Sequence, residues 1–324
     1  MTIVVGIDIA KQTFDIATLQ DNGKYRTKAK LSNNAAGFEV FRQWLLKHAE
    51  ADAWVVMEAT GIYHEALAEW LFKLGYRVCV LNPAQMAYYA RSQLQRVKTD
   101  KVDAKLIADY GRRHQTELRA WQPEQPSIRR LKALVRRLKD LQELEQIEQN
   151  RLDVTNEQKV RASIESVLEH LRQQIDETLK AIKQHFDDND DLRGQRDLLT
   201  SIDGIADRTA ALVLAELGDI ERFESSRAVT AFAGLNPRLQ ESGMLKGHVR
   251  ISRMGSVRLR AGLYMPGIVS ITRNPAIRAL AERMRANGKT GKQIICAAMR
   301  KLLCIAYGVL KSGKPFDPLL AIAR

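Results

Sequence analysis

Four acidic residues of the sequence have types and spacing that could bind a metal ion. Asp8 interrupts the apolar run TIVVGIDI, and a buried carboxylate needs a cation or a hydrogen-bond partner. Glu58 ends the apolar stretch WVVME, directly before a glycine-containing turn. Asp100 and Asp103 are three residues apart in KTDKVDAKL, so on a helix both point to one face. Carboxylate oxygens are the ligands that Mg²⁺ or Mn²⁺ prefers.

These residues fall on a regular order of expected elements. Runs of β-branched and apolar residues predict a three-stranded antiparallel meander, which alternating helices and strands follow. This is the order of the ribonuclease-H-like fold, in which the first and fourth strands are adjacent and a later helix can cross them. The four carboxylates should therefore meet. The expected strands are 2–9, 13–20, 25–31, 54–57 and 77–81, and the expected helices include 63–74 and about 101–113.

A carboxylate cluster of this kind suits phosphodiester chemistry. Like charges repel at neutral pH and so call for a divalent cation. Two such ions about 4 Å apart can clamp the attacking and leaving oxygens of a phosphodiester. Taken singly, the residues have structural explanations, since Asp100 alone is an ordinary helix N-cap. Together they predict a Mg²⁺ or Mn²⁺ site.

The middle of the chain carries a long apolar seam at helical spacing. It predicts a helical hairpin or a long coiled coil, interrupted by a polar stretch near 151–158. Such a hairpin either packs on itself or joins protomers, and we favour the joining of protomers into a dimer or tetramer. The seam residues are Leu131, Leu134, Leu138, Leu141, Ile164, Leu168, Leu171, Ile175, Leu179, Ile182 and Phe186.

Composition divides the chain further. The net charge is +13, but residues 225–324 carry 18 Lys or Arg and three acidic residues, a net +15. The preceding 224 residues balance 33 basic against 35 acidic groups. A one-sided surplus predicts a polyanionic partner, here nucleic acid. We expect an α/β catalytic domain at 1–124, a helical coiled-coil connector at 125–190 and a mostly helical basic domain at 191–324.

The apolar runs, the N-terminus and the cysteines of the sequence bear on the cellular compartment of the protein. No apolar run approaches the roughly 20 residues of a membrane span, and the N-terminal MTIVVGIDIAK reads as a strand and not as a signal peptide. Cys79, Cys296 and Cys304 have no metal-site spacing and fit reduced thiols. We therefore expect a cytoplasmic protein with no membrane partner.

An ordered set of short motifs resembles one known family. GIDIAK, MEATG, LNPAQ, KTDKVDA, SIDGI, AFAGLNPR, ESG, LYMP and KLLCIAYGVLKSG occur in this order over almost the whole chain. The set is similar to that of the DEDD (RuvC-like) transposases of the one-ten insertion-sequence family, which are related to Piv-type DNA invertases. The resemblance implies that Asp8, Glu58, Asp100 and Asp103 form a RuvC-like catalytic tetrad. It also implies a nucleophilic serine, which carries over to Ser242 in the ESG motif.

The surroundings of Ser242 fit that role. Gly243 and Gly247 allow a phosphate close to the backbone, and Lys246, Arg250 and Arg253 would offset charge on a phosphorane. No base is evident nearby, so a metal held by the carboxylates is the expected activator. The resemblance implies a site shared between protomers and guidance by a structured noncoding (bridge) RNA. The surface expected to bind the phosphate backbone of the nucleic acid consists of Arg273, Arg278, Arg283, Arg285, Lys289 and Lys292.

The leading hypothesis is thus a transposase that cuts and rejoins DNA through a covalent serine intermediate. A RuvC-like nuclease or Holliday-junction resolvase with water as nucleophile stays open, as does a passive DNA-binding protein. A sugar-kinase-like or actin-like ATPase would need a second Gly-rich phosphate hairpin, which the sequence does not offer. The sequence leaves open the target, the number of metal ions, and whether Ser242 acts in cis or in trans.

Overall fold

The computed structural model describes residues 3–49, 52–94, 99–238, 241–242, 245–246 and 250–319. The side chains of residues 101, 241, 242, 245 and 246 lie outside this description. The chain divides into two compact units, Met1–Pro123 and Glu124–Arg324.

The first unit is built on one mixed sheet with strand order β3-β2-β1-β4-β5. The antiparallel meander and the parallel strands that follow confirm the predicted order of elements. β1 is central, antiparallel to β2 and parallel to β4. The strands are β1 (Val4–Ile9), β2 (Thr13–Leu19), β3 (Tyr25–Ser32), β4 (Trp54–Glu58) and β5 (Arg77–Leu81).

Helices cover both faces of this sheet, because alternate residues of the central strand are apolar on each side. Val5, Ile7 and Ile9 pack into a core with α1 and α2, whereas Val4 belongs to a second core with α3 and α4. The helices are α1 (Ala35–His48), α2 (Glu65–Lys73), α3 (Pro83–Ser92) and α4 (Asp100–Arg113), followed by the 3-10 turn η1 (Gln115–Glu117).

The helix α4 lies directly on the central strand because two glycines remove the side chains between them. A Cβ on Gly6 would stand 2.3 Å from both the carbonyl oxygen of Ala104 and the nitrogen of Ala108. A Cβ on Gly111 would stand 2.7 Å from Cγ1 of Val4. The C-terminal part of α4 thus covers the start of β1, so its first turn points towards Asp8.

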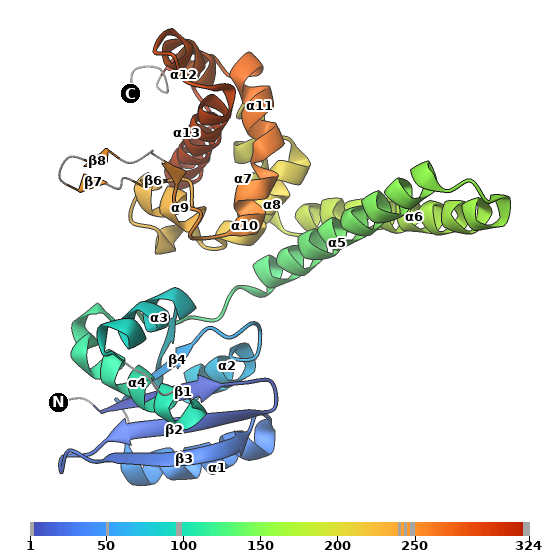
Figure 1. Cartoon of the computed structure of the whole chain (residues 1–324). Coiled ribbons are helices and arrows are strands. Elements are labelled where there is room, and N and C mark those ends of the chain that lie inside the picture. The colour runs from blue at the N-terminus through green and yellow to red at the C-terminus, as the bar shows by residue number, and fades with distance from the viewer. Residues whose placement is uncertain are drawn as a thin grey trace. The chain divides into compact units, whose positions relative to one another are not determined.

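The second unit begins with the helical hairpin α5 (Pro126–Val154) and α6 (Gln158–Asp187), which Figure 1 shows as two long helices side by side. The predicted seam is largely buried between them and the adjoining helices, as at Leu131, Leu141 and Leu168. Nε of Arg172 lies 3.1 Å from Oε1 of Glu145 and ties one helix to the other. The hairpin therefore packs on itself.

The rest of this unit is mostly helical, as predicted, and one apolar core holds it together. Its helices are α7 (Asp190–Thr200), α8 (Asp207–Leu217), the 3-10 turn η2 (Ile220–Arg222), α9 (Ser226–Phe232), α10 (Val257–Gly262), α11 (Tyr264–Arg273), α12 (Pro275–Ala286) and α13 (Gly291–Ser312). Four two-residue strands interrupt them: β6 (Pro237–Arg238), β7 (Glu241–Ser242), β8 (Leu245–Lys246) and β9 (Arg250–Ile251).

One helix among the described residues, α13, is long and apolar enough to cross a membrane by length and composition alone. In the structure α13 packs against α7, α9, α11 and α12. Leu302, Leu303 and Ala306 are essentially inaccessible within that packing. The helix therefore forms the centre of the second unit's core.

Candidate active site

Asp8 and Glu58 lie side by side at the ends of two neighbouring strands. The parallel register pairs Ile7 with Met57, and the two acidic residues come next in each strand. Side chains two residues apart share a face, so Asp8 follows Gly6 and Glu58 follows Val56 on the face that α4 covers. Strands about 4.8 Å apart therefore present both carboxylates to the same space.

The first turn of α4 supplies the other two predicted carboxylates. Asp100 and Asp103 are the acidic residues of that turn, which follows the N-cap Thr99. Backbone N–H groups at a helix N-terminus favour negative charge there. The structure thus gathers all four predicted residues around one end of β1.

A fifth carboxylate, Asp15, belongs to the same neighbourhood and was missed in the sequence. It pairs with Asp8 across the antiparallel β1–β2 ladder, and directly opposed residues share a face. Asp15 is buried, and its Oδ1 accepts a hydrogen bond from the backbone N–H of Lys30 at 2.7 Å. An acidic residue inside the apolar run TFDIATL is the same signal that marked Asp8, so it could have been found.

The electrostatics show how close these groups are. Burial is the largest cause that raises the pKa of Asp8 from 3.8 to about 7, and repulsion from Asp103 is the next. Smaller repulsions come from Asp100, Glu58 and Asp15, in that order. Every one of these causes disfavours the ionised form of Asp8. A bound cation would reverse the balance.

The donor set fits a hard divalent cation, since it consists of carboxylate oxygens alone. Nevertheless, the part of the chain that the structure describes contains no group of three or more His, Cys, Asp or Glu that could hold a metal ion as it stands. The carboxylates are thus gathered but do not form a finished ligand set.

The predicted nucleophile, Ser242, belongs to β7, which Figure 1 shows paired with β8 on a narrow ribbon of the second unit. The strand β6 pairs with β9, and farther out β7 pairs with β8, with Ser242 opposite Leu245. Only the backbone of Ser242 and of Lys246 is described, so their side chains lie outside the described residues.

Two glycines allow the arms of this ribbon to meet at its root. A Cβ on Gly255 would stand 2.2 Å from the carbonyl oxygen of Phe232, and one on Gly234 would stand 2.5 Å from Nη1 of Arg260. Both glycines have positive φ, of 135° and 68°. Oγ of Ser256 donates to Oε2 of Glu216 at 2.7 Å and links the root to α8. The AFAGLNPR motif therefore anchors the ribbon.

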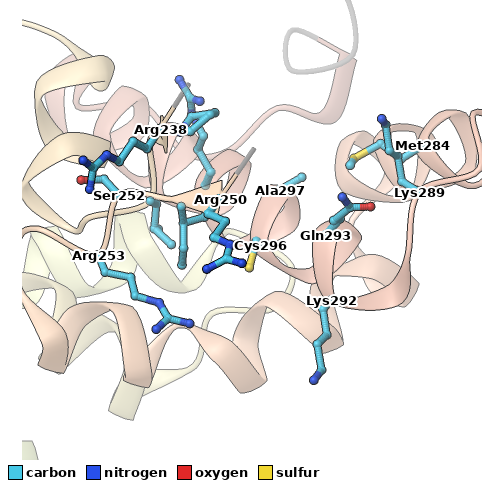
Figure 2. A pocket seen from close by; sticks show the side chains of 14 residues that line it. Arg238, Arg250, Ser252, Arg253, Met284, Lys289, Lys292, Gln293, Cys296 and Ala297 are labelled. Carbon is cyan, nitrogen blue, oxygen red and sulfur yellow. The ribbon is translucent and has the colours of Figure 1, made fainter. Parts of the chain in front are cut away.

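A pocket of about 1070 Å³ opens beside that root, between β6, β9 and the beginning of α13 (Figure 2). Among the described residues its lining includes six cationic and no acidic side chains, together with the apolar Leu235 and Ile251. A cationic lining of this kind suits a phosphate backbone. The cationic residues are Arg238, Arg250, Arg253, Lys289, Lys292 and Arg300.

The predicted nucleic-acid-binding residues other than Lys246, whose side chain is not described, are thus distributed over two places. Four of them, Arg250, Arg253, Lys289 and Lys292, line the pocket. Arg273, Arg278, Arg283 and Arg285 are exposed on α11 and α12 and do not line it. Sequence reasoning missed Arg238 and Arg300, although Arg238 stands in the quoted AFAGLNPR motif and pairs with Arg250.

Comparison with known proteins adds two family matches. Residues 5–158 match a model of DEDD transposases of the IS110 type, described as transposase. Residues 196–282 match a second model, described as transposase of the IS116/IS110/IS902 family.

Individual relatives agree with these models. The chain is 34% identical over 320 residues to the pilin gene-inverting protein of Moraxella bovis, and the match covers 97% of each protein. It is 33% identical over 153 residues to a transposase for insertion sequence element IS1328 of Yersinia enterocolitica, covering 46% of this chain and 44% of that protein.

Proposed function

The chain belongs to the IS116/IS110/IS902 transposase family, and on that premise we propose that it cuts and rejoins DNA through a covalent bond to Ser242. It is an enzyme of DNA transposition or inversion. The observation that supports the metal part of this mechanism is the gathering of Asp8, Glu58, Asp100 and Asp103 around one end of β1, where burial and the neighbouring carboxylates raise the pKa of Asp8. Such a cluster is arranged for a divalent cation near a phosphodiester.

The carboxylates Asp8, Glu58, Asp100 and Asp103 would hold Mg²⁺ or Mn²⁺. When bound, the ion would stabilise negative charge on the phosphate oxygens. In the proposed step the Ser242 hydroxyl attacks phosphorus and loses its proton. The Oγ–P bond forms, the P–O bond to the departing deoxyribose breaks, and the departing oxygen gains a proton. Attack by a DNA hydroxyl on the new phosphodiester reverses these changes, so no ATP is consumed.

The second unit would bind the nucleic acid. The cationic pocket is lined by residues of β6 and β9, at the root of the ribbon that carries Ser242, and in this proposal a strand bound there extends towards the nucleophile. The exposed arginines of α11 and α12 add contacts to the phosphate backbone of the nucleic acid. In this proposal the strand belongs to donor or target DNA, and a structured noncoding RNA guides the choice.

We assign carboxylate catalysis to residues 1–124, assembly of a dimer or tetramer to 125–190, and nucleic-acid binding with the serine to 191–324. Five large apolar side chains of the hairpin are exposed and support assembly through it: Leu144, Ile147, Val154, Val160 and Val167. The enzyme would act in the bacterial cytoplasm, where its DNA lies.

A trapping assay tests the proposal. The protein is incubated with its element ends, the flanking noncoding RNA and Mg²⁺, then digested and searched for a DNA-linked peptide by mass spectrometry. We expect an adduct on the Ser242 peptide that disappears in Ser242→Ala and is reduced in Asp8→Ala. Cleaved DNA without an adduct, and full activity of Ser242→Ala, would leave a RuvC-like nuclease or junction resolvase that uses water.

A further inference from the structure

The side chain of Asn33 joins two segments that follow the candidate catalytic strands. Asn33 stands in the turn between β3 and α1. Its Nδ2 donates to the carbonyl oxygen of Ala10 at 3.0 Å and to that of Tyr63 at 3.1 Å. Ala10 comes two residues after Asp8, and Tyr63 comes five residues after Glu58.

The position of Asn33 is itself fixed by its neighbours. Its backbone N–H donates to the carbonyl oxygen of Gln12 at 2.8 Å. The next residue, Asn34, caps α1 by accepting from the N–H of Gly37 at 3.1 Å. Both partners of the Asn33 amide are carbonyl oxygens, so only the NH₂ group can face them and the amide has one orientation. The hydrogen bonds of the turn therefore hold the Asn33 side chain in position for both contacts.

The contact occurs where β1 and β4 separate. Their described ladder ends with Ile7 opposite Met57, after which one chain turns into β2 and the other runs towards α2. Asp8 and Glu58 are the next residues along each chain. A cross-link two residues after Asp8 and five residues after Glu58 limits how far the two backbones can move apart.

We propose that Asn33 is a positioning residue that fixes the separation of the Asp8 and Glu58 carboxylates by clasping the segments behind them. This inference rests on the proposed role of these carboxylates in metal binding. Asp8 and Glu58 extend from neighbouring backbones just past the last described pair of the β1–β4 ladder, so the separation of their carboxylates depends on how firmly those backbones are held. Residues that orient metal ligands commonly change metal affinity by 10-fold to 100-fold when they are replaced.

The test compares Asn33→Ala, the milder Asn33→Ser and the matched control Asn34→Ala in the full chain. The control removes an adjacent asparagine that caps α1 but does not contact either segment's carbonyl in the described hydrogen bonds. Mn²⁺ binding is measured by titration calorimetry above pH 7, and hydrogen exchange is followed in peptides spanning 8–13 and 58–65 without metal.

We expect Asn33→Ala to bind Mn²⁺ about tenfold more weakly and to exchange faster in both peptides, with Asn33→Ser in between. Asn34→Ala should lower the melting temperature but keep Mn²⁺ affinity and exchange in both peptides unchanged. Unaltered Mn²⁺ affinity in Asn33→Ala and Asn33→Ser would overturn the inference and leave the proposed function intact. Absence of Mn²⁺ binding in the unaltered protein, or unchanged binding in Asp8→Asn, would instead overturn the metal site on which it rests.

Discussion

Asp8 lies directly opposite Asp15 in the antiparallel pairing of β1 with β2. Two acidic side chains on one sheet face are unfavourable in the absence of a cation, and like charges in opposed positions destabilise a ladder. The Asp8–Asp15 pair therefore lowers the stability of the sheet, which is typical of residues kept for a functional site.

Replacement of Asp8 should stabilise the metal-free protein. The pKa of Asp8 is about 7 in the folded state, above its ordinary value of 3.8. The folded protein therefore retains a proton that the unfolded chain loses, and its free energy of unfolding falls as pH rises from about 4 through 7. Asp8→Asn should add about 2 kcal/mol at pH 8, less than the whole shift because solvent screens the charges. Thermal unfolding across pH measures this, and a gain that persists at pH 4 would contradict the explanation.

Asp15→Asn should shift the pH dependence of metal binding. The amide keeps an oxygen that can accept from Lys30 but removes one of the charges that raise the pKa of Asp8. Protons then compete less with the cation, so the midpoint of Mn²⁺ binding should move to lower pH by less than about 1 unit. Calorimetric titrations at several pH values check this. A midpoint that rises, or the loss of folding, would refute it.

Gly6→Ala should separate α4 from the sheet. The new Cβ would meet backbone atoms of Ala104 and Ala108 at 2.3 Å, which no side-chain rotation can relieve. We expect a loss of about 2–3 kcal/mol in stability and loss of DNA cleavage. Gly194→Ala on α7 is the matched control, because its Cβ meets nothing within 4 Å and alanine favours a helix. Chemical denaturation with a cleavage assay distinguishes the two variants.

The cationic pocket predicts the salt dependence of nucleic-acid binding. Arg250→Ala and Lys292→Ala should each weaken binding and reduce the slope of log affinity against log salt by about 1. Lys180→Ala removes the same charge from the exposed surface of α6 and serves as control. Fluorescence anisotropy at several salt concentrations gives the slope. Equal losses in all three variants would point to net charge and not to the pocket.

The exposed apolar residues of the hairpin predict how protomers assemble. Ile147 and Val160 are 46% and 48% exposed, so charged replacements should not disturb the fold. Ile147→Glu and Val160→Glu should reduce the molar mass measured by light scattering from an oligomer to a monomer. Val40→Glu, at a position 42% exposed on α1, should leave the mass unchanged. Oligomers that persist in both hairpin variants would place the interface elsewhere.

Sequence reasoning was strongest where one residue's type conflicted with its surroundings. Asp8 could be recognised because a carboxylate interrupts an apolar run, and the order of strands then located its neighbours. The long seam of α5 and α6 followed from periodicity, but the same pattern fits contact within one chain and contact between chains.

Other features depend on long-range geometry that no local pattern reveals. The membership of Arg238 and Arg300 in the pocket depends on how the ribbon root meets α13. The role of Asn33 depends on two backbone carbonyls that are 23 and 30 residues away. Charge and spacing alone cannot distinguish such residues from ordinary surface groups.

The placement of all five carboxylates in the first unit bears on the order of synthesis. The pairing of β1 with β4 joins residues that are 50 positions apart, and Asp100 and Asp103 come from α4, so the cluster cannot form until α4 has been synthesised. From then on a growing chain contains all five carboxylates well before Ser242 is added. A nascent or truncated protein would therefore acquire its acidic centre while still lacking the residue proposed to attack DNA.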